Sequence, residues 1–165
     1  MMQKDFIGNN SLDNIKQIIS DIGAKKILLI TGKDSYKTSG SKEKLAQYLD
    51  NVIIKRFFDF EVNPNIKDVQ IGIDIISSFK PDLVIAIGGG SVIDIAKLIN
   101  IFAVHVTKEK EIFEFVNKSS SVTRPGLPLI AIPTTSGTGS EATHFAVVYI
   151  GNKKYSFAHK YVLPN

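Results

Sequence analysis

The stretch that most narrows the possible folds of this sequence is LVIAIGGGSVIDIAK, from Leu83 to Lys97. It consists of five apolar residues, three glycines, one serine and a longer apolar-rich segment. A short, wholly apolar run is typical of a strand covered on both faces, as in parallel sheets. Glycines let the backbone turn sharply into a following helix. The segment therefore predicts a buried parallel strand, a tight turn and a buried helix, the unit of α/β folds.

The same alternation continues along the chain. Short runs rich in Ile and Val predict strands at Lys26–Thr31, Asn51–Phe57, Asp82–Ile87, Leu127–Pro133 and Phe145–Ile150. Apolar residues three and four apart predict helices at Ser11–Ile22, Ser41–Asp50, Asn65–Phe79 and Ser91–Ala103. A hairpin turn with Gly-Asn at its tip is expected within Ile150–Tyr155. This order predicts an α/β fold with a doubly wound, mainly parallel, Rossmann-like sheet.

Composition excludes several classes of protein. A chain of 165 residues is the size of one domain, and the absence of cysteine excludes disulfides and thiolate metal sites. We therefore expect a cytoplasmic protein. No apolar run reaches the length of a membrane span, and the first residues lack a signal-peptide core. The net charge of +4 comes with lysines spread along the chain, so neither nucleic acid nor membrane is expected as a partner.

The three glycines predict a binding site. Ligands of doubly wound sheets lie at the carboxyl ends of the strands, and Gly88, Gly89 and Gly90 join such an end to a helix that begins near Ser91. The first N–H groups of a helix have no internal acceptor and its dipole is positive there, so an anion such as a pyrophosphate fits. We also expect Gly89 to need a positive φ. A tight turn without a ligand is the alternative, because the usual dinucleotide and P-loop patterns are absent.

A second loop strengthens the hypothesis of a nucleotide site. The segment IPTTSGTGSEAT, from Ile132 to Thr143, follows a predicted strand and carries small hydroxyl side chains with two glycines between them. In a parallel sheet this loop can open on the same edge as the glycine loop. The pair predicts a nucleotide bound across a crevice, with a flexible loop of no function as the alternative.

Together, Gly88–Lys97 and Pro133–Glu141 resemble the signature stretches of the iron-containing (group III) alcohol dehydrogenase family, and Val62–Asn65 resembles its Asn-Pro element. The resemblance covers nearly the whole chain. It implies that residues 1–165 form a dinucleotide-binding domain of the dehydroquinate synthase-like type. It also implies a C-terminal helical domain that holds iron or zinc through one Asp and three His. The implied activity is hydride transfer between NAD(P) and a small alcohol or aldehyde.

The resemblance also implies individual roles. The cofactor-binding positions of the family correspond to Asn63, Gly88, Gly89, Gly90, Ser91, Asp94, Thr134, Thr135, Thr138 and Lys154. The second and third glycines and the serine would meet the pyrophosphate, and the threonines the phosphates and the adenosine half. Asp94 would lie near the nicotinamide and is the only candidate catalytic residue; Lys154 would reach the nicotinamide ribose. For Lys97 and Lys154 the alternative interpretation is that they are ordinary solvated lysines on the surface.

Two departures from the family concern the metal and the cofactor. The sequence stops at Asn165, where the helical domain would follow, and none of its three histidines falls at a family ligand position. We therefore expect no metal site and an isolated chain that binds dinucleotide without turnover. Gly32 stands where NAD-dependent relatives carry an Asp that binds the ribose, which removes a carboxylate that would repel a 2′-phosphate. NADP(H) is thus favoured over NAD(H), with Asp34 as the counter-argument.

Other readings remain open. The TGKDSYK segment resembles a subgroup that acts on phosphonoacetaldehyde-like substrates. The alternatives are a stand-alone nucleotide-binding module, or the N-terminal half of an enzyme related to glycerol dehydrogenase or dehydroquinate synthase. We also expect an exposed apolar face, chiefly after Tyr149, that favours a homo-oligomer.

Overall fold

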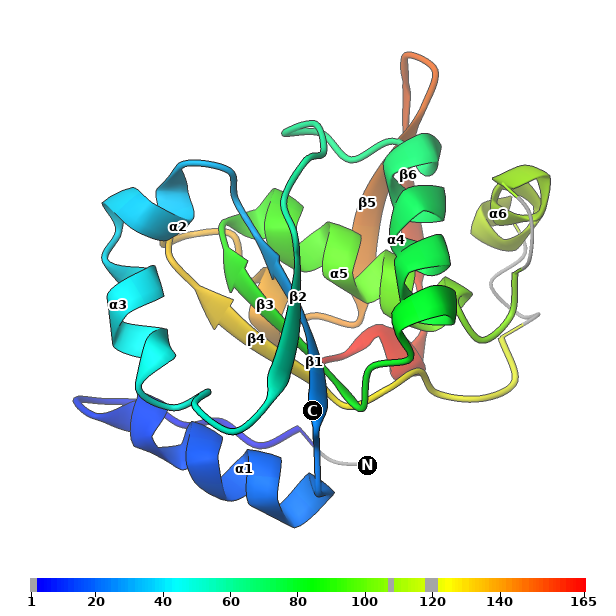
Figure 1. The fold of residues 1–165 in the computed structure, drawn as a ribbon. Helices are drawn as coiled ribbons and strands as arrows, with labels where there is room; N and C mark the ends of the chain where they lie inside the picture. The colour runs from blue at the N-terminus through cyan, green and yellow to red at the C-terminus, as the bar shows by residue number, and fades with distance from the viewer. Residues whose placement is uncertain (1–2, 107–108, 118–121) are drawn as a thin grey trace.

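The computed structural model describes residues 3–106, 109–117 and 122–165. Its central sheet has four parallel strands, in the order β2-β1-β3-β4 (Figure 1). The strands are β1 (Lys26–Thr31), β2 (Ile53–Phe57), β3 (Leu83–Gly88) and β4 (Leu129–Pro133). The chain leaves β1 for β2 on one side and returns to β3 on the other. The carboxyl ends of β1 and β3 therefore form the topological switch point, where ligands of such sheets bind, and the predicted doubly wound sheet is confirmed.

The register of the sheet brings three loops together. Thr31 pairs with Ile87, and Gly88 pairs with Pro133. The turn after β1, the glycine loop after β3 and the hydroxyl-rich loop after β4 therefore start at the same level on one edge of the sheet.

Helices cover both faces of the sheet (Figure 1). Alternate residues of β1 point to opposite sides: Leu28 and Ile30 belong to the core beneath α4 (Ile66–Phe79) and α5 (Gly90–Phe102), whereas Ile27 and Leu29 belong to the other core. That second core includes residues from α1 (Asn14–Ile22), α2 (Ser35–Thr38) and α3 (Ser41–Ala46). The strand is covered on both sides, as its unbroken apolar sequence predicted.

Local sequence explains where the main helices begin and end. The Asn65 side chain accepts hydrogen bonds from the N–H groups of Lys67 and Asp68, and Asp68 accepts one from the Asn65 N–H, so a capping box starts α4. Gly23 ends α1 in the left-handed conformation, with φ of 68°. Every residue of α5 from Val92 to Phe102 is buried, which confirms the buried helix predicted after the glycines.

Other elements differ from the sequence predictions. The predicted helix Ser41–Asp50 ends at Ala46, and Ser11–Asp13 forms a 3-10 turn, η1, ahead of α1. Neither α2 nor α6 (Glu109–Asn117) was predicted; α2 is a single helical turn, too short to show an apolar period. β5 (Phe145–Ile150) pairs with β6 (Lys153–Ala158) in a separate antiparallel hairpin. Gly151 turns this hairpin with φ of 57°, as the Gly-Asn pair predicted.

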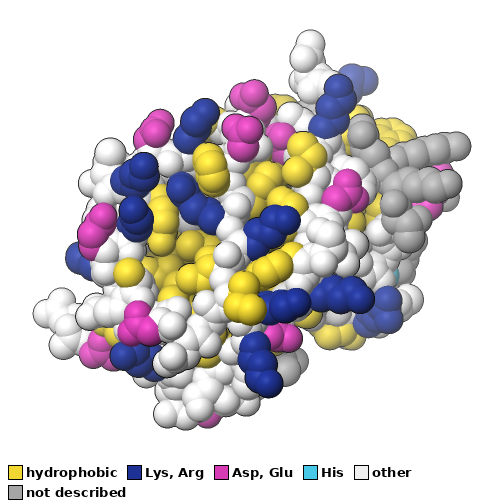
Figure 2. Space-filling model, viewed as in Figure 1, with side chains coloured by type: hydrophobic (Ala, Val, Ile, Leu, Met, Phe, Trp, Pro, Cys, Tyr) yellow, Lys and Arg dark blue, Asp and Glu magenta, His cyan; other side chains and the backbone are white. Residues whose placement is uncertain are grey.

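The expected apolar exposure after Tyr149 is wrong. Phe157 and Val162 are buried, because the hairpin packs on α5 and the Phe157 ring lies 4.9 Å from the Phe102 ring. Exposed large apolar side chains lie elsewhere, including Ile53 and Ile54 on the edge strand β2. Figure 2 shows hydrophobic side chains open to solvent in the middle of this face, with charges of both signs scattered around them. In the described part of the chain no helix is long and apolar enough to cross a membrane.

Candidate functional site

A cavity of about 290 Å³ opens at the N-terminal end of α5. Its walls come from the segment before α4, from α5, from the loop after β4 with η3 (Ser140–Ala142), and from the β5–β6 hairpin. The lining residues are Asn63, Pro64, Gly90, Ser91, Asp94, Thr138, Ser140, Val147, Tyr149 and Lys154. The structure thus brings most of the residues predicted to bind a cofactor, which are distant in sequence, around one space.

The remaining predicted residues lie beside this cavity. The Thr134 N–H donates to the Gly88 carbonyl over 3.0 Å, so the two loops are joined at their bases. Thr135 stands next to Gly89, since a Cβ built on Gly89 would lie 3.2 Å from the Thr135 Oγ1. The side chains of Thr134, Thr135 and Thr138 are exposed and therefore free to meet a ligand.

One prediction about the glycine loop, the positive φ at Gly89, is wrong. The φ of Gly89 is −76°, and Gly88 and Gly90 are likewise outside the positive-φ region. The space around these glycines limits what a side chain could occupy. A Cβ on Gly88 would lie 2.5 Å from the Val92 side chain, and one on Gly90 would lie 3.2 Å from the Ser140 Oγ. The glycines let α5 start close to β3 and let the hydroxyl-rich loop pack against its first turn.

Asp94 is a carboxylate held between the cavity and the protein interior. It is 9% exposed, and its Oδ2 accepts a hydrogen bond from the Val147 N–H over 3.2 Å. The Oδ1 is buried without a hydrogen-bond partner in the described residues. Burial raises the pKa of the Asp94 carboxyl, and the Val147 N–H and the Lys97 charge oppose that rise. Asp94 is therefore a largely desolvated carboxylate in the wall of the cavity.

Lys97 is buried, so the alternative interpretation of a solvated surface lysine is wrong for this residue. It is 1% exposed, and its ammonium donates to the carbonyls of Thr143 at 2.7 Å and Phe145 at 3.0 Å and to the Thr143 hydroxyl at 3.2 Å. Burial lowers the pKa of Lys97 to about 8, while Asp94 and Glu141 act to raise it. Lys97 thus ties α5 to the end of the hydroxyl-rich loop. Lys154, by contrast, is exposed and lines the cavity.

Sequence reasoning missed the contribution of β5. The Tyr149 N–H donates to the Pro64 carbonyl over 2.8 Å, which places Tyr149 against the segment before α4, and the Val147 N–H bonds to Asp94 of α5. No local pattern marks these residues, because their place depends on how the hairpin docks. Ser140 was noted only as one of several hydroxyls in its loop.

Two of the three histidines make local hydrogen bonds to the backbone. His105 Nδ1 lies 2.9 Å from the Ile101 carbonyl, and its Nε2 accepts from the Thr123 N–H. His159 Nδ1 accepts from the Tyr161 N–H in the turn that it begins. Within residues 3–106, 109–117 and 122–165, no group of three or more His, Asp or Glu side chains is arranged to hold a metal ion. The described residues therefore do not fit the iron or zinc that the family resemblance implies.

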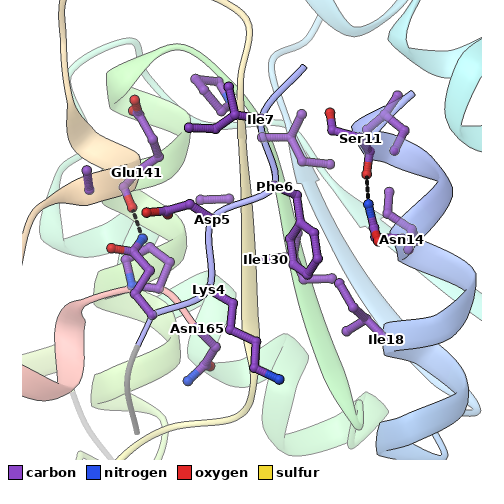
Figure 3. Close-up of a pocket in the computed structure, with 18 of the residues that line it drawn as sticks. Lys4, Asp5, Phe6, Ile7, Ser11, Asn14, Ile18, Ile130, Glu141 and Asn165 are labelled. Carbon is purple, nitrogen blue, oxygen red and sulfur yellow. Dashed lines mark hydrogen bonds between the residues drawn. The ribbon is translucent and has the colours of Figure 1, made fainter. Parts of the chain in front are cut away.

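A larger cavity of about 510 Å³ lies elsewhere, between the N-terminal segment, α1 and β4 (Figure 3). Figure 3 shows the Phe6 ring beside Ile130 and Ile18, with Glu141 at the other end. The Gln3 side-chain amide donates to the Glu141 carbonyl over 2.6 Å. None of the residues predicted to bind a cofactor lines this space, so its size alone assigns it no part in the site.

The smaller cavity has the chemistry of an anion site. Its floor is the N-terminal end of α5, which attracts phosphate oxygens through free N–H groups and the helix dipole. The hydroxyls of Ser91, Thr135 and Thr138 are further donors, and Lys154 adds a positive charge. Glycines keep the approach to this helix end free of side chains.

Three known proteins are similar to this chain in sequence or in structure, and two of them are described with a nicotinamide dinucleotide. The mitochondrial hydroxyacid-oxoacid transhydrogenase of Caenorhabditis elegans is 38% identical over 141 residues, which cover 82% of this chain and 30% of that protein. The NADPH-dependent butanol dehydrogenase of Clostridium saccharobutylicum is 33% identical over 166 residues, 97% of this chain and 41% of that protein. The sulfoacetaldehyde reductase of Bifidobacterium kashiwanohense, solved in complex with NAD⁺, superposes with a TM-score of 0.84 at 26% identity, covering 100% of this chain and 45% of the other.

The chain thus spans less than half the length of each of these proteins. The family model described as iron-containing alcohol dehydrogenase matches residues 3–165. With nearly the whole chain matched and both loops meeting at the carboxyl edge of the sheet, this chain belongs to the iron-containing alcohol dehydrogenase family.

Proposed function

We propose that this chain is the dinucleotide-binding part of an oxidoreductase that interconverts an alcohol and an aldehyde. One observation carries the proposal: the glycine loop, the hydroxyl-rich loop and Lys154 meet around the N-terminal end of α5, at the carboxyl edge of a parallel sheet. An anionic ligand is favoured there by the helix end and by the lysine.

Each part of the site has a proposed role. The N–H groups of Gly90 and Ser91 donate to the pyrophosphate, together with the Ser91 and Thr138 hydroxyls. Lys154 binds the ribose next to the nicotinamide, and Asp94 accepts a hydrogen bond from the nicotinamide end. Asn63 closes the rim of the cavity. Asp94 and Lys154 line the same cavity, so both are assigned to the nicotinamide half of the cofactor.

A bound nicotinamide would supply or accept the hydride. The residues described here orient it: the Val147 N–H holds the Asp94 carboxylate by a hydrogen bond, and the Tyr149 N–H fixes the rim to the Pro64 carbonyl. The described residues hold no cluster of metal ligands. We therefore propose that residues 1–165 bind the cofactor and that polarisation of the substrate oxygen needs groups other than these.

The sequence and the relatives also support a proposal about which dinucleotide is bound and which class of substrate is used. Gly32 presents no carboxylate to a 2′-phosphate, and Lys33 and Lys37 follow it, which supports NADP(H) over NAD(H). The relatives include an NADPH-dependent enzyme and one solved with NAD⁺, so they support both. The reductase of sulfoacetaldehyde among them supports a small aldehyde with an anionic group, as does the resemblance of the TGKDSYK segment to enzymes for phosphonoacetaldehyde-like substrates.

Adjacent lysines on the hairpin provide the test. Lys153 and Lys154 are both exposed, but only Lys154 lines the cavity. In calorimetric titrations with NADPH and NADH, Lys154→Met should weaken both dinucleotides about 10-fold, the value of one charge-assisted hydrogen bond. Lys153→Met is the matched control and should bind as the original chain does. Equal effects of the two substitutions, or no binding by the original chain, would sink the proposal.

A turnover assay tests the division of labour. Residues 1–165 should bind NADPH yet leave it unoxidised in the presence of short aldehydes with added Fe²⁺ or Zn²⁺. Metal-dependent oxidation of NADPH by this chain would contradict the proposal that the substrate oxygen is polarised by other groups.

A further inference from the structure

Arg56 makes an unusual set of contacts at the carboxyl edge of the sheet. It is the residue before the last on the edge strand β2 and pairs with Leu29 of β1. Its side chain runs forward to the end of β1, where Nε donates to the Thr31 hydroxyl over 2.7 Å. The Nη2 group donates to the carbonyls of Gly32 at 2.8 Å and Lys33 at 3.1 Å. The guanidinium thus holds the turn that follows β1.

Two aromatic rings hold the same guanidinium. Its central carbon lies 4.7 Å from the centroid of the Tyr36 ring and 4.3 Å from that of the Phe58 ring. Tyr36 is buried, and burial raises the pKa of its hydroxyl while the Arg56 charge acts to lower it. Cation–π contacts of this kind fix the plane of the guanidinium. Arg56 is therefore a positive charge whose position is set before any ligand arrives.

Part of this guanidinium remains available. Arginine has five N–H groups, and the hydrogen bonds above use Nε and Nη2; within the described residues nothing accepts from Nη1. The residue is only partly buried. The exposed lysines Lys33 and Lys37 add positive charge to the same turn, and the exposed Asp34 is the acidic group beside them.

The turn lies where the far end of a bound dinucleotide would reach. The pairing of Thr31 with Ile87 places Gly32 next to Gly88, across the switch point. If the pyrophosphate lies at the start of α5 and the nicotinamide end enters the cavity with Asp94 and Lys154, the adenosine ribose extends over the Gly32–Lys33 turn. This step rests on the function proposed above.

We propose that Arg56 determines cofactor specificity: it fixes the Gly32–Lys33 turn and offers its free Nη1 group to the 2′-phosphate of NADP(H). A guanidinium suits a phosphate because it is always charged and its N–H groups form charge-assisted hydrogen bonds to phosphate oxygens, and here the free Nη1 group can donate one. Gly32 supports this role, because a side chain there would collide with the Ser35 hydroxyl and stand beside the phosphate. NAD(H) has only a hydroxyl at this place, so it gains little from the charge.

The experiment compares ligands that differ in the 2′-phosphate alone. Dissociation constants for NADPH, NADH, adenosine 2′,5′-bisphosphate and AMP are measured for the original chain, Arg56→Met, Arg56→Lys and Lys55→Met. Lys55 is the exposed neighbour on β2 and serves as the control. Arg56→Met should weaken the two 2′-phosphorylated ligands about 10- to 100-fold and the other two less than about 2-fold. Arg56→Lys should fall between the original chain and Arg56→Met.

The outcomes separate this inference from the proposed function. If the original chain binds no dinucleotide, the proposed function fails. If it binds NADH more tightly than NADPH, or if Arg56→Met weakens all four ligands equally, Arg56 only supports the turn and the inference is overturned. Should Arg56→Met fail to fold, the original chain still decides. Its preference for NADPH should shrink several-fold between 50 mM and 500 mM salt, as a charge contact requires, and an unchanged preference refutes the inference.

Discussion

Replacing Lys97 by methionine tests the buried ammonium that links α5 to the hydroxyl-rich loop. Methionine keeps much of the length and apolar contact of lysine but donates no hydrogen bond. The Thr143 and Phe145 carbonyls would lose their donor. The effect most specific to Lys97 is a change in how stability depends on pH.

The magnitude follows from the pKa of Lys97, which is about 8 in the folded chain against 10.5 for an ordinary lysine. Between these values the unfolded chain keeps a proton that the folded chain has released. Stability contributed by this group therefore rises with pH, and linkage gives a rise of about 2 kcal/mol between pH 7 and pH 9.5. In Lys97→Met this contribution is absent, so the original chain should gain about 2 kcal/mol on the variant over that interval.

Urea unfolding at pH 7 and pH 9.5 measures this difference, because other titrating groups are common to both proteins and cancel. Lys67→Met, which replaces an exposed lysine on α4, is the control and should follow the original chain at both values. If the original chain and Lys97→Met change in parallel with pH, the ammonium is not desolvated as its contacts indicate and the reasoning is refuted.

Two further substitutions test how the site is supported. Gly72→Ala should destabilise the chain by about 1 to 2 kcal/mol, because a Cβ on Gly72 would collide with the Ile99 side chain where α4 meets α5. The same substitution in an Ile99→Ala background should cost no stability. A similar loss of stability in both backgrounds would contradict the packing argument. Asn65→Ala should lower the free energy of unfolding by about 1 kcal/mol, because the capping box is lost. Urea unfolding measures this, with Ser77→Ala at an exposed position as the control. Equal midpoints for the two variants would show that the cap contributes nothing.

Much of the fold could be predicted from local patterns. The apolar runs of β1 and β3 predicted buried parallel strands because a strand covered on both faces needs apolar residues at every position. The cap at Asn65, the stop at Gly23 and the hairpin tip at Gly151 were also visible, since turns and helix ends depend on a few neighbouring residues. The short helix α2 was not, because one helical turn leaves no periodic pattern.

The candidate site was predicted in part for a similar reason. Gly88–Ser91 and Thr134–Thr138 stand at the ends of predicted strands, and the parallel order of those strands brings the two loops together. The residues were therefore named correctly as neighbours, as the Thr134 to Gly88 hydrogen bond confirms. The positive φ expected at Gly89 was wrong, because its φ is −76°, and the structure shows instead that the Thr135 side chain limits the space beside it.

The sequence by itself therefore determined the strands, the turns and the two loops, because these depend on residues close along the chain. Only the tertiary structure decided that Tyr149 and Val147 complete the cavity, that Lys97 is buried under the hydroxyl-rich loop, and that Arg56 reaches across to the end of β1. Each of these contacts joins segments more than 20 residues apart. From sequence alone, a charged side chain is predicted to lie on the solvated surface. Only the packing of elements distant in the sequence decides whether it is buried and desolvated.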